Sequence, residues 1–146
     1  MIRIAVVDDD REEAQEFCAQ LQFTSGELQE PYSLETFSSG TEFLAQYRKQ
    51  YELICLDIDM PEKDGIAVAE EIRRRDTKVL IMFITHMAQM AIRGYEVQAV
   101  DFVLKPVNKY ALLLKMQRIR KSLSQRKEAF FLVPDDGGVR KISSRE

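Results

Sequence analysis

The chain has 146 residues, of which 45% are hydrophobic and 31% are charged, and its formal net charge is −3. This composition is typical of one soluble globular domain with a short appendage at most, and the acidic balance argues against nucleic-acid binding by this chain alone. No apolar run approaches the ~20 residues of a membrane span, no signal peptide precedes the first strand-like segment, and the two cysteines lack metal-ligand spacing. We therefore expect a cytoplasmic protein with reduced cysteines.

The first part of the chain predicts a strand, a helix and a second strand. Residues 2–7 form a short apolar run typical of a buried strand, and three aspartates follow it. Asp10, the last of them, forms a capping box with Glu13, which predicts a helix that ends before a loop at residues 24–31. Residues 32–37 alternate between apolar and polar side chains and are expected to form a strand near the sheet edge.

The middle of the chain predicts a buried strand between two helices. Ser39 and Glu42 form a second capping box, which opens the first of these helices. Residues 53–56 are an unbroken apolar run, typical of a strand covered on both faces, and the run ends at Asp57. After a turn, the second helix ends in three arginines, residues 73–75, whose charges complement the negative end of the helix dipole.

The last part of the chain repeats this alternation. Residues 79–84 are the most hydrophobic strand and end on Thr85, and a helix over residues 87–92 is expected to stop at Gly94 as its C-cap. Residues 99–104 form the fifth strand. Asn108 then caps a last helix whose apolar face carries Leu112, Met116, Ile119 and Leu123. Five strands alternating with five helices predict an α/β fold with a doubly wound parallel sheet.

The composition changes towards the C-terminal end. Residues 122–127 are polar and basic, as expected for a helix end that runs into a linker. Residues 130–133 and 139–142 flank a Pro-Asp-Asp-Gly-Gly turn and predict a β-hairpin, which cannot bury a core of its own. We therefore predict a first domain over residues 1–125, and a linker with the truncated start of a second, β-rich domain over residues 126–146.

Chemically active side chains follow four of the predicted strands. They are Asp8, Asp9, Asp57, Thr85 and Lys105. Because the carboxyl ends of parallel strands meet at one edge of the sheet, we expect these residues to converge in one pocket. Three carboxylates there repel one another by roughly 4 kcal/mol per close pair at an effective dielectric of about 20. Lys105 offsets part of this repulsion, and a divalent cation with oxygen ligands, typically Mg²⁺, is the natural source of further positive charge.

A carboxylate nucleophile, a hard cation, an ammonium and a hydroxyl are what phosphoryl transfer to an aspartate requires. In this interpretation Asp57 attacks phosphorus, Lys105 and the cation stabilise charge on the transferred oxygens, and Thr85 donates a hydrogen bond to one of them. No residue is diagnostic by itself. A lone aspartate at a strand end is usually structural, and Thr85 alone is an ordinary strand terminus.

Four motifs carry this chemistry: Val6-Val7-Asp8-Asp9, Leu56-Asp57-Ile58-Asp59-Met60-Pro61 with Asp64-Gly65, Thr85, and Lys105-Pro106. In order and spacing they resemble the signature of the receiver domains of two-component response regulators, over roughly residues 1–125. The resemblance implies a flavodoxin-like (βα)5 fold and phosphorylation of Asp57 by a phosphohistidine on a sensor histidine kinase. It also implies a phosphoacceptor signalling domain rather than an enzyme, with only Mg²⁺-assisted self-phosphorylation and slow self-dephosphorylation.

The resemblance further implies a metal site and a switch. Mg²⁺ or Mn²⁺ is expected to take its ligands from four aspartates, directly from Asp9, Asp57 and the backbone carbonyl of Asp59, and through water from Asp8. Phe102 matches the switch aromatic, which turns inward when Thr85 is drawn towards the phosphoryl group, and a plain core position is the alternative for it. The peptide bond before Pro106 is expected to be cis.

A longer segment of the sequence indicates the subfamily. Residues 94–106 resemble the version found in regulators with a LytTR-type DNA-binding domain, and residues 130–146 look like the opening strands of that domain. The resemblance implies a transcription regulator that binds DNA through a C-terminal domain largely missing from this chain. Phosphorylation is expected to promote a homodimer through the face around the fourth and fifth helices.

Two positions depart from the family pattern. His86 stands where similar proteins usually carry a small residue, and it can either partly gate the mouth of the pocket or face the surface as an inert imidazole. Asp59 places a carboxylate beside the path of the water molecule that would hydrolyse the phosphorylated aspartate. We expect both residues to alter the lifetime of the phosphoryl group.

Two other functions compete with this one. The same fold can serve as a phosphorylation-independent dimerisation module, although such pseudo-receivers usually lose one of the pocket groups that are complete here. The pair Asp57 and Asp59 after an apolar strand also resembles the nucleophile motif of haloacid-dehalogenase phosphatases. That family has a threonine where Pro61 stands and places its acidic metal pair after the nucleophile, so this resemblance is weaker.

Overall fold

A five-stranded parallel sheet forms the centre of the molecule in the computed structural model, which describes residues 1–132, 134–135 and 138–139. The strand order is β2-β1-β3-β4-β5. The strands are β1 (Ile2–Val7), β2 (Tyr32–Phe37), β3 (Leu53–Leu56), β4 (Leu80–Thr85) and β5 (Asp101–Leu104). This order and direction confirm the predicted doubly wound α/β fold, with β2 at one edge.

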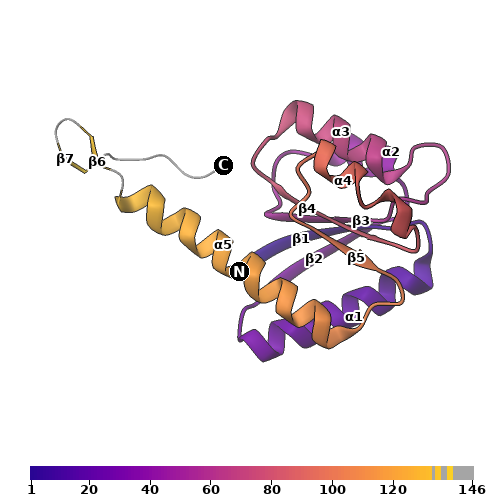
Figure 1. Ribbon diagram of the computed structural model, residues 1–146, viewed down its shortest axis with the longest axis horizontal. Helices are drawn as coiled ribbons and strands as arrows, with labels where there is room; N and C mark the ends of the chain where they lie inside the picture. Colours follow the sequence, from indigo (N-terminus) through magenta and orange to yellow (C-terminus); the bar gives the residue numbers. More distant parts are fainter. Residues whose placement is uncertain (133, 136–137, 140–146) are drawn as a thin grey trace.

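Helices cover both faces of this sheet (Figure 1). On one face lie α1 (Arg11–Leu28) and α5 (Lys109–Leu132), and on the other α2 (Gly40–Gln46), α3 (Gly65–Arg75) and the short α4 (Arg93–Glu96). A 3-10 turn, η1 (Ala88–Met90), precedes α4. Among the described residues, no helix combines the length and apolar character that a membrane span needs.

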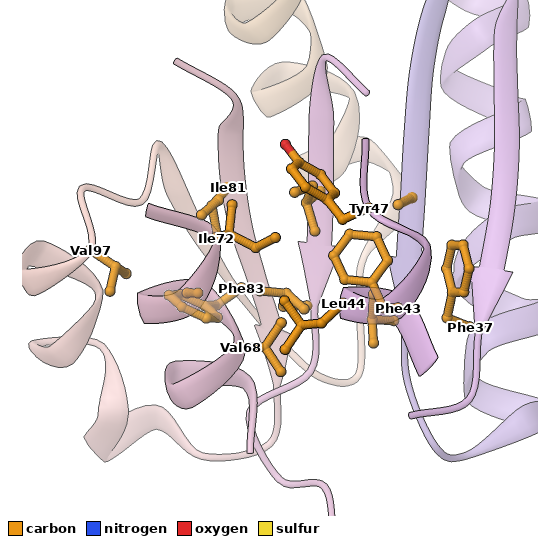
Figure 2. Close-up of a cluster of buried hydrophobic side chains, with 14 of the residues drawn as sticks. Phe37, Phe43, Leu44, Tyr47, Val68, Ile72, Ile81, Phe83 and Val97 are labelled. Carbon is orange, nitrogen blue, oxygen red and sulfur yellow. The ribbon is translucent and has the colours of Figure 1, made fainter. Parts of the chain in front are cut away.

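Alternation along the strands divides the buried side chains between two cores. In β1, Ile4 and Val6 point towards α1 and α5, whereas Ala5 and Val7 point towards α2 and α3. Figure 2 shows the second core, in which side chains of α2 and α3 pack on β4 and on Phe37 at the end of β2. Helices cover both faces of the sheet, so the central strands β3 and β4 bury side chains on both faces and consist of unbroken apolar runs.

The first helix is longer than predicted. Asp10 caps it as expected, since its carboxylate accepts a hydrogen bond from the Glu13 amide at 3.0 Å. The predicted loop at residues 24–31 is wrong for its first five positions, because α1 continues to Leu28. Thr24 is buried in the helix, and its hydroxyl donates to the carbonyl of Leu21 at 2.8 Å, so this polar side chain does not end the helix. The helix ends instead at Gln29, which is left-handed with φ 53°.

The fourth helix differs from the prediction in position and ending. The predicted helix over residues 87–92 is replaced by the turn η1, and Gly94 lies inside α4 rather than capping an earlier helix. Gly94 is buried, and a Cβ there would lie 3.5 Å from the Cβ of Ala99 and 3.7 Å from the ring of Phe83. These are ordinary van der Waals distances, so a small side chain would also fit at this position.

The C-terminal prediction is partly wrong. Asn108 caps α5 as predicted, with its side-chain oxygen accepting from the amides of Tyr110 and Ala111. However, α5 runs to Leu132, so residues 130–132 are helical where a strand was predicted. The first residue that cannot continue a helix is Pro134. Two short strands, β6 (Pro134–Asp135) and β7 (Gly138–Val139), pair antiparallel, and the remainder of the predicted hairpin, residues 133, 136–137 and 140–142, lies outside the described residues.

Candidate functional site

Four predicted site residues meet at the carboxyl edge of the sheet. Asp8 follows β1, Asp57 follows β3, Thr85 ends β4 and Lys105 follows β5, and these four strands are neighbours in the sheet. Their exposed fractions are 6%, 6%, 0% and 8%, respectively. The prediction that these strand ends converge is confirmed, and the result is a buried polar cluster in which each charge depends on its neighbours.

The position of Asp57 is set by the sheet on one side and by α3 on the other. Its amide donates to the carbonyl of Val7 at 2.9 Å, which continues the ladder between β3 and β1. The chain then turns back, and the amide of Gly65 at the start of α3 donates to the carbonyl of Ile58 at 2.9 Å. Asp64 caps α3 by accepting from the amide of Ala67 at 2.8 Å. These bonds hold the Asp57 side chain at the sheet edge.

Lys105 is surrounded by carboxylates. Its ammonium donates to Asp8 at 2.7 Å, to Glu13 at 2.6 Å and to Asp57 at 3.3 Å. Burial by itself would lower the pKa of Lys105, but the hydrogen bonds to Asp8 and Glu13 and the charge of Asp57 outweigh it and hold the pKa above its ordinary value. Lys105 is therefore a fixed positive charge. The Lys105–Pro106 bond is cis, as predicted.

Asp57 titrates differently from an exposed aspartate. Burial and the nearby charge of Asp8 raise its pKa to about 6, although Lys105 and the Thr85 hydroxyl act in the opposite direction. Burial, with the charges of Asp8 and Asp59, also raises the pKa of Asp9. Ionising all these carboxylates is thus unfavourable even with Lys105 in place, unless further positive charge is supplied.

The carboxylates are arranged as a divalent cation requires. One oxygen from each of Asp8, Asp9 and Asp57 lies within 4.8 Å of the other two. Asp9 is exposed and leaves one side of this cluster open to water. An all-oxygen donor set with access for water suits Mg²⁺ or Mn²⁺, so these three residues fit the predicted metal. The Asp59 side chain is exposed and lies outside this set, while its amide donates to Asp57 at 3.2 Å.

Of the two predicted switch residues, Thr85 belongs to the cluster and Phe102 lies on the neighbouring strand β5. The hydroxyl of Thr85 is buried and accepts a hydrogen bond from the amide of Met87 at 3.3 Å. Phe102 on β5 is half-buried, and its ring centroid lies 6.5 Å from that of Phe83 on β4. The aromatic side chain therefore borders the core, and β4 connects it to Thr85.

His86 is mostly exposed but has a partner. Its side chain is 58% exposed, and its Nε2 lies 3.0 Å from a carboxylate oxygen of Glu13, the same residue that binds Lys105. The structure thus agrees with neither alternative in full, since the imidazole faces outward and is also joined to the pocket through Glu13.

Glu13 is the site residue that the sequence interpretation missed. The sequence predicts a capping box with Asp10, but only half of that box forms: Asp10 accepts from the Glu13 amide, while the Glu13 carboxylate turns to Lys105 and His86. The available signal was its spacing, because a residue one helical turn after the aspartates faces the same edge of the sheet.

The comparisons agree with this geometry. The response regulator receiver domain family matches residues 4–117. Sensory transduction protein LytT of Oceanobacillus iheyensis is 33% identical over 129 residues, which cover 86% of this chain and 51% of LytT. Sensory transduction protein LytR of Streptococcus mutans is 29% identical over 122 residues, which cover 82% of this chain and 49% of LytR. The chain thus spans about half the length of the curated relatives it matches.

Solved structures show the same fold. A CheY-like response regulator receiver domain protein from Methanospirillum hungatei superposes with a TM-score of 0.73 at 26% identity. The match covers 88% of this chain and 98% of that one. The similarity to LytT and LytR is consistent with the predicted LytTR-type subfamily.

Proposed function

Because the chain belongs to the response regulator receiver family, we propose that it accepts a phosphoryl group on Asp57 from a sensor histidine kinase and passes the signal to the output of a transcription regulator. One observation carries the proposal. The buried carboxylate of Asp57 meets the Lys105 ammonium, the Thr85 hydroxyl and two further carboxylates, Asp8 and Asp9, at one edge of the sheet.

The Asp57 carboxylate is the nucleophile in this proposal. With a pKa of about 6 it is largely ionised at neutral pH and can attack phosphorus. A phosphorus–oxygen bond forms to Asp57 while the bond from phosphorus to the kinase imidazole breaks, and its electron pair returns to that nitrogen. Lys105 balances charge on the transferred oxygens, and Thr85 turns its hydroxyl to donate to one of them. Slow hydrolysis by water, which Asp59 flanks, ends the signal.

The direct metal ligands would be the carboxylates of Asp9 and Asp57, with the backbone carbonyl of Asp59 added by likeness to the family, and Asp8 would bind the metal through water. Bound Mg²⁺ or Mn²⁺ would supply the positive charge that lets an anionic phosphoryl donor approach three carboxylates. The raised pKa values of Asp9 and Asp57 are consistent with this assignment: burial is their main cause, and the neighbouring carboxylates add to it.

Phosphorylation is proposed to switch the chain between a monomer and a homodimer. Thr85 would move towards the phosphoryl group and Phe102 would turn further inward, a population shift between two packings of β5. Large apolar side chains are exposed in and beside α4 and β5, namely Ile92, Tyr95, Val100 and Leu104. Tyr110 and Leu114 of α5 are exposed as well, and exposed apolar side chains of this kind support a dimer contact on the face around α4 and α5.

The output is proposed from the likeness to LytT and LytR. Residues 126–146 would form a linker and the start of a LytTR-type DNA-binding domain, so DNA would be bound through that domain and not by residues 1–125. The basic side chains of α5 support this division, because several are engaged within the domain: Lys115 and Arg118 bind Asp101, and Arg120 binds Glu30. A cytoplasmic location, where a kinase would phosphorylate the chain, is part of the same proposal.

Phosphate labelling tests this function. The chain is incubated with Mg²⁺ and radiolabelled acetyl phosphate, and separately with beryllofluoride, beside the variant Asp57→Asn and a sample with EDTA. We expect an acid-labile label in the wild type only, absent with EDTA, and a shift to dimer in size-exclusion chromatography. A label that survives in Asp57→Asn would contradict the assignment of the acceptor. A dimer without any label would favour the phosphorylation-independent module.

A further inference from the structure

The Glu13 carboxylate lies between two cationic or potentially cationic groups at the mouth of the pocket. Its Oε1 is 2.6 Å from the ammonium of Lys105, and its Oε2 is 3.0 Å from Nε2 of His86. The first distance is the shortest of the three that Lys105 makes to carboxylates. Glu13 is therefore a full partner of a residue on which phosphoryl transfer depends.

The start of α1 keeps Glu13 in this position. Asp10 caps the helix through the Glu13 amide, which fixes the backbone of this residue at the first turn. Hydrogen bonds from Lys105 and His86 lower the pKa of Glu13, so the carboxylate stays ionised at neutral pH. The side chain is 34% exposed, whereas the carboxylates of Asp8 and Asp57 are nearly enclosed.

A lysine ammonium has three hydrogens to donate. In Lys105 all three are directed to carboxylates, namely Asp8, Glu13 and Asp57. A phosphoryl group that binds Lys105 must displace one of these bonds. Asp8 is buried and Asp57 is the attacking group, so Glu13, which can turn into water, is the partner that is displaced at the lowest cost.

We propose that Glu13 is a positioning residue that competes with the incoming phosphoryl group for the ammonium of Lys105, and that His86 holds it in the competing position. This inference rests on the proposed phosphorylation of Asp57. It assigns Glu13 the role of a brake: while its carboxylate occupies Lys105, the ammonium is not free for the phosphoryl oxygens, and the negative charge at the mouth repels an anionic donor.

The rate of phosphorylation by acetyl phosphate at saturating Mg²⁺ tests this role of Glu13. We expect Glu13→Gln to raise the rate at subsaturating acetyl phosphate by about tenfold, the size of one charge-assisted hydrogen bond, and to lower the half-saturating concentration. Glu12→Gln is the matched control, because it removes the same charge from the same turn of α1 at an exposed position. Glu12→Gln should change the rate by less than about twofold. Equal effects of the two variants, or a slower Glu13→Gln, would overturn the proposal.

The part played by His86 is tested by a double-mutant cycle. His86→Ala should accelerate labelling severalfold in the wild-type background, because Glu13 loses one of its two partners. In the Glu13→Gln background the same substitution should have no further effect, since the two residues act as one unit. Independent, additive effects would show that His86 does not act through Glu13.

A readout without phosphorylation completes the test. In metal-free protein, proton exchange between water and the Lys105 ammonium is followed by nitrogen-15 NMR of the lysine side chains. We expect faster exchange in Glu13→Gln than in the wild type and in Glu12→Gln. Unchanged exchange would overturn the competition for Lys105. Failure to label the wild type would instead refute the proposed function, and the brake with it, so the two failures are distinguishable.

Discussion

Gly65 packs against the backbone of Asp57 so closely that no side chain fits at this position. A Cβ added to Gly65 would overlap the carbonyl oxygen of Asp57 and would lie 2.9 Å from the Cα of Ile58. Both obstacles are backbone atoms, which cannot move aside as a flexible side chain can. The start of α3 and the end of β3 are thereby pressed together, and the orientation of Asp57 depends on this contact.

Gly65→Ala is therefore expected to destabilise the protein. Overpacking against backbone atoms costs about 1–3 kcal/mol in the free energy of unfolding. Gly26→Ala is the control, because a Cβ at Gly26 meets no atom within 4 Å and alanine favours the helical backbone of α1 by about 0.5–1 kcal/mol. Urea unfolding measures both. If Gly65→Ala stabilised the protein as much as Gly26→Ala does, the close contact between α3 and the end of β3 would not be needed for stability.

Asp57→Asn should stabilise the metal-free protein in a pH-dependent way. Burial raises the pKa of Asp57 from 3.8 to about 6, so between these values the folded protein binds the proton more tightly than the unfolded chain does. Ionisation of Asp57 thus lowers stability as the pH rises. We expect Asp57→Asn to increase the free energy of unfolding by about 1–3 kcal/mol at pH 7.5, and this gain to disappear as the pH falls from about 6 to below 4.

The measurement is urea unfolding in EDTA over this pH range. Glu12→Gln serves as the control, because an exposed carboxylate away from the cluster should change stability by less than about 0.5 kcal/mol at every pH. A difference between wild type and Asp57→Asn that stays constant from pH 4 to pH 8 would contradict the raised pKa.

Arg73 and Arg74 should contribute differently to stability, although both lie in the last turn of the same helix. The Arg73 guanidinium donates to backbone carbonyls of Val79 at 2.7 Å, Val97 at 2.7 Å and Gln98 at 3.1 Å, and so joins α3 to the start of β4 and to the turn before β5. Arg74 is exposed. We expect Arg73→Met to lower the free energy of unfolding by about 2–3 kcal/mol and Arg74→Met by less than about 0.5 kcal/mol. Equal losses would favour the helix-dipole interpretation for both.

The strand ends were predictable because their signals are local. An apolar run marks each of β1, β3 and β4, and the polar residue that ends a run must lie at the carboxyl edge of a parallel sheet, which is enough to place Asp8, Asp57 and Thr85. Helix ends were less predictable, since Thr24 satisfies its hydroxyl within α1 and Gly94 lies inside α4 instead of ending a helix.

The roles of Glu13 and Arg73 depend on contacts that are distant in sequence. Glu13 reaches Lys105 across 92 positions, and Arg73 reaches the carbonyl of Val97 across 24. Each side chain has an adequate local explanation, as a capping residue or as a charge at a helix end. Local sequence patterns therefore do not predict these long-range contacts, and only the fold shows which partner each charged side chain has.

The hydroxyl of Thr85, rather than the shape of its side chain, should connect phosphorylation to dimerisation. Thr85 is fully buried, and its oxygen already accepts from the Met87 amide at the start of the segment that leads to α4. A hydroxyl drawn towards a phosphoryl group would therefore pull on this segment. We expect Thr85→Ala to be labelled on Asp57 but to remain monomeric with beryllofluoride and Mg²⁺, whereas Thr85→Ser, which keeps the hydroxyl, should dimerise. Light scattering after size-exclusion chromatography gives the mass of each variant. If Thr85→Ala dimerises as the wild type does, the Thr85 hydroxyl does not couple phosphorylation to dimerisation. The exposed apolar side chains around α4 and β5 would then respond to phosphorylation without Thr85.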